Sequence, residues 1–418
     1  MLVLETVAGA TRSYRLRAYP NGAQRRMIDR WLGAVRWLWN TSLGIRSEAY
    51  RECHLSLTGI DISRWLTQWK RTPDHIWLAE IPATCLTQCL RDQDRAFANF
   101  FAHRGRYPKF KRRCAGGTLR FQDVGASWSA GILSLPKLEK LKLAEELPGI
   151  EKPDMVILSR DAAGRYFVSF TSEIEASSLS LSIVNRSVGV DLGLTHLATL
   201  STGEKVVNPK RLKAHLRYLR QQQRCLARRQ KGSKRREKQR LRVAKIQAKI
   251  RQERQAAIHG LTTRLVREFD LIAIEHLNVK ALARGMHARA IHDAAFGEIR
   301  RQLLYKGDAA GRVILEVSPW FPSSKTCSHC RHVLDELKLD ERQWRCPRCG
   351  THHDRDINAA RSILHEGMRE IAGCDDRVLR VNARDACFDD FDFIEQVLAA
   401  EARNGHPERA CAEQASSR

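Results

Sequence analysis

The chain lacks any apolar segment long enough to cross a membrane. Among its 418 residues no apolar run approaches the roughly 18–20 residues that a spanning helix needs. Its first residues, Met-Leu-Val-Leu-Glu-Thr-Val, have no basic segment leading into a long apolar stretch, which argues against a secretory signal. We therefore expect a cytoplasmic protein without a membrane partner.

Acidic residues are scarce relative to basic ones. The sequence has 47 Asp and Glu against 72 Lys and Arg, which gives a formal net charge of +25. An excess of this size points to a polyanionic partner, most commonly nucleic acid, with a basic membrane-surface protein as the alternative. Twelve cysteines scattered through a chain without a secretion signal favour a reducing compartment and a metal site over a disulfide framework.

Four of the cysteines form two CxxC pairs with 15 residues between them: Cys327 and Cys330, then Cys346 and Cys349. Four thiolates at this spacing can hold a tetrahedral Zn²⁺ and leave no coordination position open for chemistry. We expect a structural zinc ribbon over residues 321–350. Asp356 follows shortly afterwards, at the start of an expected helix.

Three acidic residues lie in or at the end of an expected strand, or at the start of an expected helix. Asp191 lies in the apolar strand at 188–193, Glu275 ends the strand 271–275, and Asp356 begins a helix. The order of strands and helices in this part of the chain is that of an RNase H-like α/β sheet. Three converging carboxylates could hold two Mg²⁺ or Mn²⁺ ions for phosphodiester hydrolysis.

Each of these residues also has a structural interpretation. Asp191 could shape a glycine-containing turn, Glu275 could simply terminate a strand, and Asp356 could cap its helix. Their joint occurrence, in this order and in a chain of net charge +25, favours the catalytic interpretation.

Two basic segments are candidates for nucleic-acid binding. In the loop 105–113 the basic residues Lys109 and Arg112 alternate with Tyr107 and Phe110, a mixture that suits phosphate neutralisation and base stacking. The alternative is a solvated loop whose aromatic residues anchor it in the core. Trp31 and Trp39 lie on the apolar stripe of an expected helix, and we expect them in the core.

The second segment runs from Lys210 to Arg254, with 19 basic residues against two acidic ones. We expect a helical hairpin at 210–268 that contacts a nucleic-acid backbone, although such charge runs are commonly only solvated faces. The candidate contacts lie near its turn: Lys231, Lys234, Arg235 and Arg236.

These motifs resemble the TnpB (OrfB) family of transposon-encoded proteins, which are similar to compact type V CRISPR effectors. The matching segments are Val188–Leu200, Ile274–Leu277, Phe321–Cys330, Cys346–Gly350 and Asp354–Ala360. The resemblance implies an RNA-guided DNA endonuclease with a RuvC-like domain. Its guide RNA would come from the transposon end, and it would cut double-stranded DNA beside a short target-adjacent motif. It assigns the catalytic, magnesium-binding roles to Asp191, Glu275 and Asp356, with Asp354 only a neighbour.

The resemblance also implies a domain order. A β-barrel wedge domain would comprise 1–18 and 115–180, with a helical recognition domain at 19–114 inserted into it. The RuvC-like nuclease domain would comprise 181–320 and 351–370, interrupted by the zinc ribbon and followed by a partly disordered tail at 371–418.

Three other functions stay open at this point. The chain could be a type V CRISPR effector guided by CRISPR RNA, an RNA-independent transposase, or a guided DNA-binding repressor. We expect a monomer, with a dimer as the alternative, in the cytoplasm of a bacterium or archaeon and at the nucleoid when on DNA.

Overall fold

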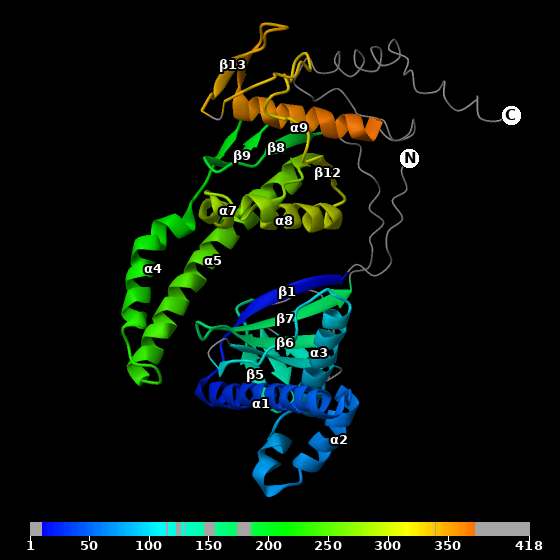
Figure 1. Cartoon of the computed structure of the whole chain (residues 1–418), viewed down its shortest axis with the longest axis vertical. Helices are drawn as coiled ribbons and strands as arrows, with labels where there is room; N and C mark the ends of the chain where they lie inside the picture. Colours follow the sequence, from blue (N-terminus) through cyan, green and yellow to red (C-terminus); the bar gives the residue numbers. More distant parts are fainter. Residues whose placement is uncertain are drawn as a thin grey trace, which may run out of the picture. The chain divides into compact units, whose positions relative to one another are not determined.

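The computed structural model describes residues 11–113, 116–122, 127–129, 131–145, 155–173, 185–338 and 340–372. The described residues fall into two units (Figure 1). The first unit takes those between Thr6 and Ser177 and between Arg217 and Lys249; the second takes those between Ser178 and Leu216 and from Ile250 onward. The expected tail at 371–418 lies outside the described residues from 373 onward, and so do residues 1–10 of the expected wedge.

The first unit is built on an antiparallel sheet of four strands in the order β1-β7-β6-β2. Its strands are β1 (Thr11–Ala18), β2 (Gly117–Gln122), β6 (Met155–Arg160) and β7 (Tyr166–Glu173). A second sheet has three strands: β3 (Ser127–Ser129), β4 (Ile132–Leu135) and β5 (Leu138–Lys142). An isolated bridge between Ala18 and Leu143 links the two.

The expected β-barrel is not found, because both sheets are open within the described part of the unit. Four strands make too narrow a sheet to curl into a barrel with a filled interior, for which about eight are typical. A helix covers the sheet instead. This helix, α1 (Gly22–Cys53), begins with a capping box in which Asn21 and Gln24 bond each other's backbone N–H groups.

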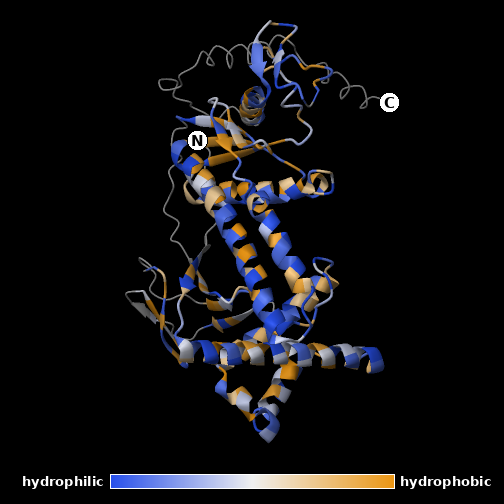
Figure 2. Cartoon of the chain, turned by 90° about the vertical axis from the view of Figure 1, so that its left-hand side faces the viewer, coloured by the Kyte–Doolittle hydropathy of each residue, from blue (hydrophilic) through white to orange (hydrophobic). Residues whose placement is uncertain are grey.

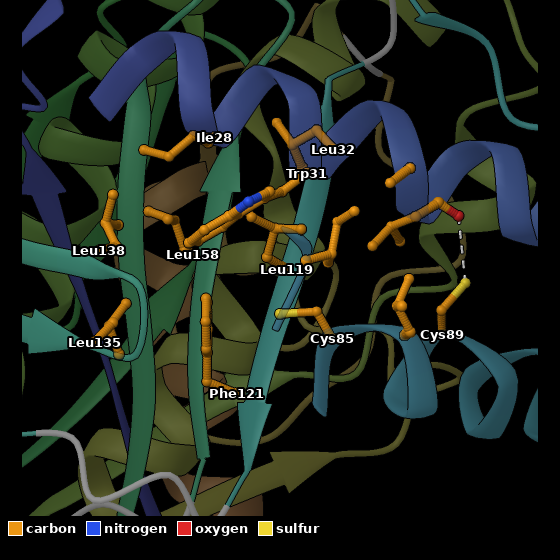
Figure 3. Packing of buried hydrophobic residues seen from close by; sticks show 14 of the residues in the cluster. Ile28, Trp31, Leu32, Cys85, Cys89, Leu119, Phe121, Leu135, Leu138 and Leu158 are labelled. Atoms are coloured by element: carbon orange, nitrogen blue, oxygen red, sulfur yellow. Dashed lines mark hydrogen bonds between the residues drawn. The ribbon is translucent and has the colours of Figure 1, made fainter. Parts of the chain in front are cut away.

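The apolar stripe of α1 packs on the strands in one continuous core. Figure 3 shows Ile28, Trp31 and Leu32 of α1 above Leu119 of β2 and Leu158 of β6. Trp31 and Trp39 are both buried, as their position on the stripe predicts. The other helices of this insert are α2 (Gly59–Trp69), the 3₁₀ helix η1 (Pro73–Glu80) and α3 (Ala83–Phe101).

The second unit contains a mixed sheet of five strands in the order β10-β9-β8-β11-β12. Its strands are β8 (Ser187–Asp191), β9 (His196–Leu200), β10 (Lys205–Val207), β11 (Leu271–Glu275) and β12 (Val313–Val317). The first three form an antiparallel meander, whereas β11 and β12 run parallel to β8. This is the RNase H-like arrangement that the sequence order indicates. The strands are largely hydrophobic (Figure 2), as expected of a sheet covered by helices.

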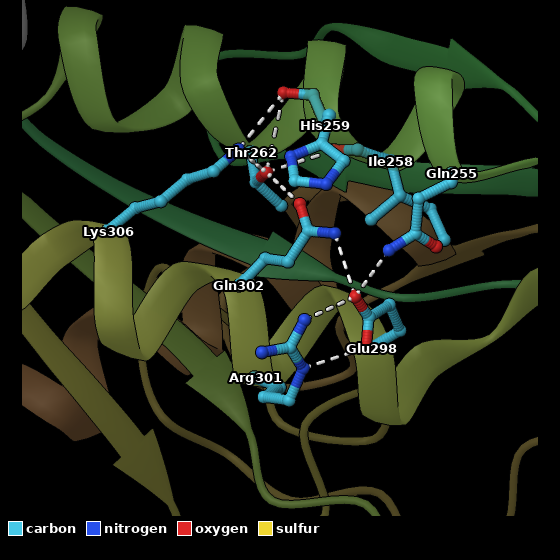
Figure 4. A network of polar contacts seen from close by, with 8 residues as sticks. All are labelled: Gln255, Ile258, His259, Thr262, Glu298, Arg301, Gln302 and Lys306. Atoms are coloured by element: carbon cyan, nitrogen blue, oxygen red, sulfur yellow. Dashed lines mark hydrogen bonds and ion pairs between the residues drawn. The ribbon is translucent and has the colours of Figure 1, made fainter. Parts of the chain in front are cut away.

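Helices connect and cover these strands. The basic hairpin consists of α4 (Arg211–Ala227) and α5 (Lys234–Glu268), and its part between Arg217 and Lys249 belongs to the first unit. The chain then passes through α6 (Val279–Leu282), α7 (Ala288–Ala294) and α8 (Phe296–Ala309). Glu298 of α8 accepts hydrogen bonds from Gln255 of α5 and from Arg301 and Gln302 (Figure 4). The bond from Gln255 joins α8 to α5, whereas the other two lie within α8. None of the described helices combines the length and the apolar character that spanning a bilayer requires.

The last described elements are β13 (Gln343–Arg345), β14 (His352–Asp354) and α9 (Arg355–Ala372). Helix α9 lies across the strands of the five-stranded sheet (Figure 1). At Gly189 of β8 it comes so close that an added Cβ would lie 1.9 Å from the carbonyl oxygen of Ala360. Only glycine allows this approach, which brings the start of α9 to the strand that carries Asp191.

Candidate active site

Asp191 and Glu275 end two neighbouring parallel strands, β8 and β11. The residues that precede them, Val190 and Ile274, are register partners. Since the two strands run in the same direction, both carboxylates emerge at the same edge of the sheet. The structure therefore brings together two of the three acidic residues that the sequence singles out.

Asp356 lies in the first turn of α9, and Asp354 caps that helix. The Asp354 Oδ1 atom accepts hydrogen bonds from the backbone N–H groups of Asp356 and Ile357, each at 3.1 Å. Its Oδ2 atom accepts a hydrogen bond from Lys205 Nζ at 2.7 Å. Asp354, two residues before the catalytic candidate Asp356, is thus the helix cap, and Lys205 of β10 supplies the cation that holds it in place.

The electrostatics show that the three carboxylates interact. The pKa of Asp191 is raised to about 7, first by burial and then by the negative charges of Glu275 and Asp356, against a smaller opposite effect of Arg355. Burial also raises the pKa of Glu275. Buried acids with mutual repulsion are poorly stabilised as anions unless a cation joins them. A bound cation would relieve this repulsion.

Arg342 provides a positive charge at this site. Its Nη1 atom lies 3.5 Å from Asp356 Oδ1, and its side chain is more than half exposed. Its backbone oxygen accepts a hydrogen bond from the N–H of Arg355. Arg342 precedes β13, so the cysteine-containing segment reaches directly to one of the three carboxylates.

The four cysteines of the CxxC pairs form a cluster in which all Sγ atoms lie within 4.8 Å of one another. The Sγ atoms of Cys327 and Cys349 are 3.7 Å apart, and those of Cys330 and Cys346 are 3.5 Å apart. Four thiolates around zinc at about 2.3 Å would be about 3.8 Å apart, so the cluster fits a zinc ion. Burial raises the pKa of Cys327 to about 12, so that a metal ion is needed to hold it as a thiolate.

Within the described residues this is the one group of three or more candidate ligands gathered so closely. The three carboxylates are spaced more widely.

Asn358 connects the cysteine cluster to α9. Its side chain accepts a hydrogen bond from the N–H of Ser328 at 2.9 Å and donates one to the carbonyl oxygen of Thr326 at 2.7 Å. All three residues are buried. Sequence reasoning did not identify Asn358, Lys205 or Arg342 as site residues. A polar residue on the buried face of α9 was the available signal for Asn358.

The two aromatic residues of the loop 105–113 have different surroundings. Tyr107 is anchored: its hydroxyl lies 2.8 Å from Ser47 Oγ, and its ring packs edge-on against Phe97 and Phe100. Phe110 instead is 62% exposed. Lys109 and Arg112, on either side of it, are exposed as well.

The candidate contacts at the hairpin turn also differ among themselves. Lys231, Lys234 and Arg235 are exposed. Arg236 donates to the carbonyl oxygens of Leu226 at 2.9 Å and Arg229 at 2.6 Å, and so satisfies the C-terminal end of α4. Its first role is to close the hairpin.

Comparisons with known proteins agree with this architecture. Residues 170–286 match the OrfB_IS605 family, described as "Probable transposase", and residues 296–363 match the "Cas12f1-like, TNB domain". Residues 10–54 match an OrfB "Helix-turn-helix domain", although here they form one strand and the single long helix α1.

Full-length relatives cover nearly the same span. A Streptomyces pristinaespiralis protein named "Putative RNA-guided DNA endonuclease" is 39% identical over 372 residues, which cover 88% of this chain and 92% of the relative. The Escherichia coli K12 protein "Putative RNA-guided DNA endonuclease InsQ" is 29% identical, over 86% of this chain and 93% of that protein. A solved Cas12f1–sgRNA–target DNA complex has a TM-score of 0.52 at 11% identity, covering 85% of this chain and 99% of that one, a likeness of fold alone.

The RNase H-like sheet with acidic residues at one edge, joined to a four-cysteine ribbon, defines a nuclease-like class of fold. Within this class the chain belongs to the TnpB (OrfB) family of transposon-encoded proteins.

Proposed function

We propose that this protein is an RNA-guided DNA endonuclease that hydrolyses phosphodiester bonds at Asp191, Glu275 and Asp356. One observation carries the proposal: Asp191 and Glu275 end adjacent parallel strands, and the charges of Glu275 and Asp356 both raise the pKa of Asp191. Carboxylates placed together in this way do not help the fold to pack, and their charges destabilise it unless cations are bound. Oxygen ligands of this kind suit Mg²⁺ or Mn²⁺.

The residues divide the work according to their positions. Asp191, whose carboxylate interacts with both other acids, would hold the divalent ions together with Glu275 and Asp356. The ions would activate a water molecule and stabilise the leaving oxygen. Asp354 and Lys205 would keep Asp356 at the start of α9. Zn²⁺ in the cysteine cluster would have a purely structural role.

The partners follow from charge and from the relatives' names. A net charge of +25 suits a chain that holds nucleic acid along its backbone. The guide RNA would derive from the transposon end and would read the target double-stranded DNA by base pairing, leaving only a short adjacent motif to the protein. We propose a monomer that acts in the cytoplasm of a bacterium or archaeon.

The domain roles belong to the same proposal. Residues 19–114 would form the recognition domain within a wedge domain of open sheets. Residues 181–320 and 351–370 would form the nuclease domain, in which the hairpin 210–268 contacts guide RNA or heteroduplex.

The test combines RNA sequencing with plasmid cleavage. RNA that copurifies with the full chain is sequenced, its guide portion is reprogrammed, and a plasmid with the matching target and a randomised flanking sequence is added with Mg²⁺. We expect the wild type to cleave only the matched plasmid. Asp191→Ala should bind the DNA without cleaving it. Absence of bound RNA, or equal cleavage by Asp191→Ala, would contradict the proposal.

The same experiment separates the alternatives. Cleavage of transposon ends by RNA-free protein would indicate an RNA-independent transposase, and guided binding without any cleavage would indicate a repressor. Copurifying RNA from a CRISPR array, in place of the transposon end, would identify a CRISPR effector.

A further inference from the structure

The first unit contains a cavity of about 910 Å³ between the loop that carries Phe110 and the ends of β2 and β6. Its lining includes Arg15, Lys109, Phe110, Arg112 and the backbone around Gly116. A volume of this order lies within the range of about 300–1,000 Å³ typical of small-molecule sites. One nucleotide would fit into it.

The loop that forms one wall is fixed to α1. Trp39 Nε1 donates to the carbonyl oxygen of Lys109 at 3.0 Å. Asn40 bonds both backbone groups of Lys111, accepting from its N–H at 2.8 Å and donating to its carbonyl at 3.1 Å. Lys111 Nζ lies 3.6 Å from the centre of the Trp39 ring. The loop is therefore held on both sides of Phe110.

Phe110 does not contribute to the core. It is 62% exposed, although the residues on either side of it are bonded to α1. Burying a phenylalanine stabilises a fold by roughly 1.5–3 kcal/mol. Phe110 does not provide this stabilisation in its exposed position. A ring that is fixed by its backbone yet exposed beside a cavity is available to stack on a ligand.

The basic side chains that line the cavity have few acidic partners. Asp161, which also lines it, is already paired with Arg165, and Arg160 is paired with Asp29. Arg15, Lys109 and Arg112 have no ion pair with any acid among the residues that the structure describes. These three cations give the cavity a positive charge that suits phosphate.

Two features shape the remaining walls. The Arg15 guanidinium lies over the ring of Phe167 at 4.2 Å from its centre, which holds this cation against β7. Gly116 has a φ of +90°, and a Cβ there would lie 2.2 Å from the carbonyl oxygen of Arg160. The chain can pass this closely along β6 only with glycine at that position.

We propose that this cavity binds one unpaired nucleotide of a bound nucleic acid, with the base stacked on Phe110 and a phosphate held by Arg15, Lys109 and Arg112. The inference rests on the proposed function and adds a specific contact to it. The nucleotide must be unpaired, because a base within a duplex already has its faces covered by its neighbours. Guide RNA and target DNA both offer this chemistry, and the test distinguishes them.

The test compares Phe110→Ala and Phe110→Trp with Phe101→Ala, a change of another exposed phenylalanine that does not line the cavity. Two dissociation constants are measured for each full-length variant: guide RNA binding to the RNA-free protein, and binding of cleavage-resistant target DNA to the RNA-loaded protein. Stacking of one base typically accounts for a change of about tenfold. We expect Phe110→Ala to weaken one of the two affinities by about that factor, Phe110→Trp to retain it, and Phe101→Ala to leave both unchanged.

Arg112→Ala adds a second measurement. Removal of a phosphate contact lowers the slope of log affinity against log salt by about one, and we expect this for the same nucleic acid that Phe110→Ala affects. Loss of RNA affinity assigns the nucleotide to the guide, and loss of only DNA affinity assigns it to the target.

Unchanged affinities for both Phe110→Ala and Arg112→Ala would overturn the inference. If the wild type cuts the matched plasmid in that case, the proposed function stands without this contact. A wild type that binds neither RNA nor DNA would overturn both. Because Phe110 is exposed, its variants should have the melting temperature of the wild type, so that misfolding does not account for lost affinity.

Discussion

The side-chain oxygen of Asn358 accepts a hydrogen bond from the backbone N–H of Ser328 at 2.9 Å. Ser328 lies within the first CxxC pair, and Asn358 lies one half-turn beyond Asp356 on α9. The cysteine cluster and the catalytic carboxylate candidate are therefore positioned by the same helix, through a side chain that is buried between them.

Asn358→Ala should lower both stability and cleavage. It leaves the N–H of Ser328 without its partner and removes one of two hydrogen bonds to the carbonyl of Thr326, which Ser362 Oγ also bonds. A buried unsatisfied group costs about 1–3 kcal/mol. We expect a lower melting temperature and slower cleavage, with one zinc per chain retained and target DNA still bound. Glu370→Ala, an exposed change on the same helix, is the control. A variant with wild-type stability would contradict the role of this bond.

Lys205→Met should impair metal use at the active site. Although burial opposes it, the hydrogen bond and charge of Lys205 lower the pKa of Asp354, which caps α9 beside Asp356. We expect a cleavage rate about tenfold lower, which corresponds to roughly 1.4 kcal/mol, and a higher Mg²⁺ concentration for half-maximal rate. Lys205→Arg should restore most of the activity because it keeps the charge. If methionine and arginine variants behave alike, the ion pair does not position the site.

Asp191→Asn should stabilise the metal-free protein at alkaline pH. The pKa of Asp191 is raised from 3.8 to about 7 in the folded protein, so the folded state binds the proton more tightly than the unfolded state. The free energy of unfolding therefore falls as the pH rises from about 4 to about 7 and stays low above that. The shift corresponds to at most about 4 kcal/mol.

Melting temperatures in EDTA at pH 5 and pH 8 test this prediction. The gain from Asp191→Asn should be larger at pH 8, whereas Asp308→Asn, a change of an exposed acid in the same unit, should give no pH-dependent gain. Equal gains at both pH values would mean that Asp191 is not destabilised by its charge.

Cys346→Ser should remove zinc and disorder the neighbourhood of Asp356, since Cys346 is buried in the four-cysteine cluster. We expect less than one zinc per chain by elemental analysis, a lower melting temperature and weak cleavage. Cys225→Ser changes an exposed cysteine outside the cluster and serves as the control. Asp356→Ala, by contrast, should keep zinc and substrate binding while cleavage is lost. A fully active Cys346→Ser variant would contradict the structural role of the cluster.

Patterns of residue type predicted the features that depend on local spacing. The apolar strand and following carboxylate at Glu275, the two CxxC pairs and the order of strands and helices all follow from short-range sequence. Whether the sheets of the first unit close into a barrel does not follow from short-range sequence. It depends on which strands pair, and β1 pairs with β7, which lies far away in the chain. The open sheets correct the expected barrel.

The side chains that support the candidate active site could not be predicted from the sequence either. Lys205 pairs with Asp354 across 149 positions, and Asn358 bonds Ser328 across 30. Neither residue type is distinctive by itself, and only the packing of α9 on the sheet gives them a function. Phe110 and Tyr107 share one motif and are both exposed, at 62% and 43%, but only Tyr107 bonds Ser47 and packs against Phe97.

The way in which the cysteine pairs divide the chain has a practical consequence for protein engineering. Cys327 and Cys330 lie on the same side of the ribbon's loop as Asp191 and Glu275, whereas Cys346 and Cys349 lie on the side of Asp356. A chain cut between Cys330 and Cys346 would yield two fragments, each with half of the thiolates and an incomplete set of carboxylates. Only the joined fragments would contain all four thiolates and all three carboxylates, so zinc binding would report on their reassembly.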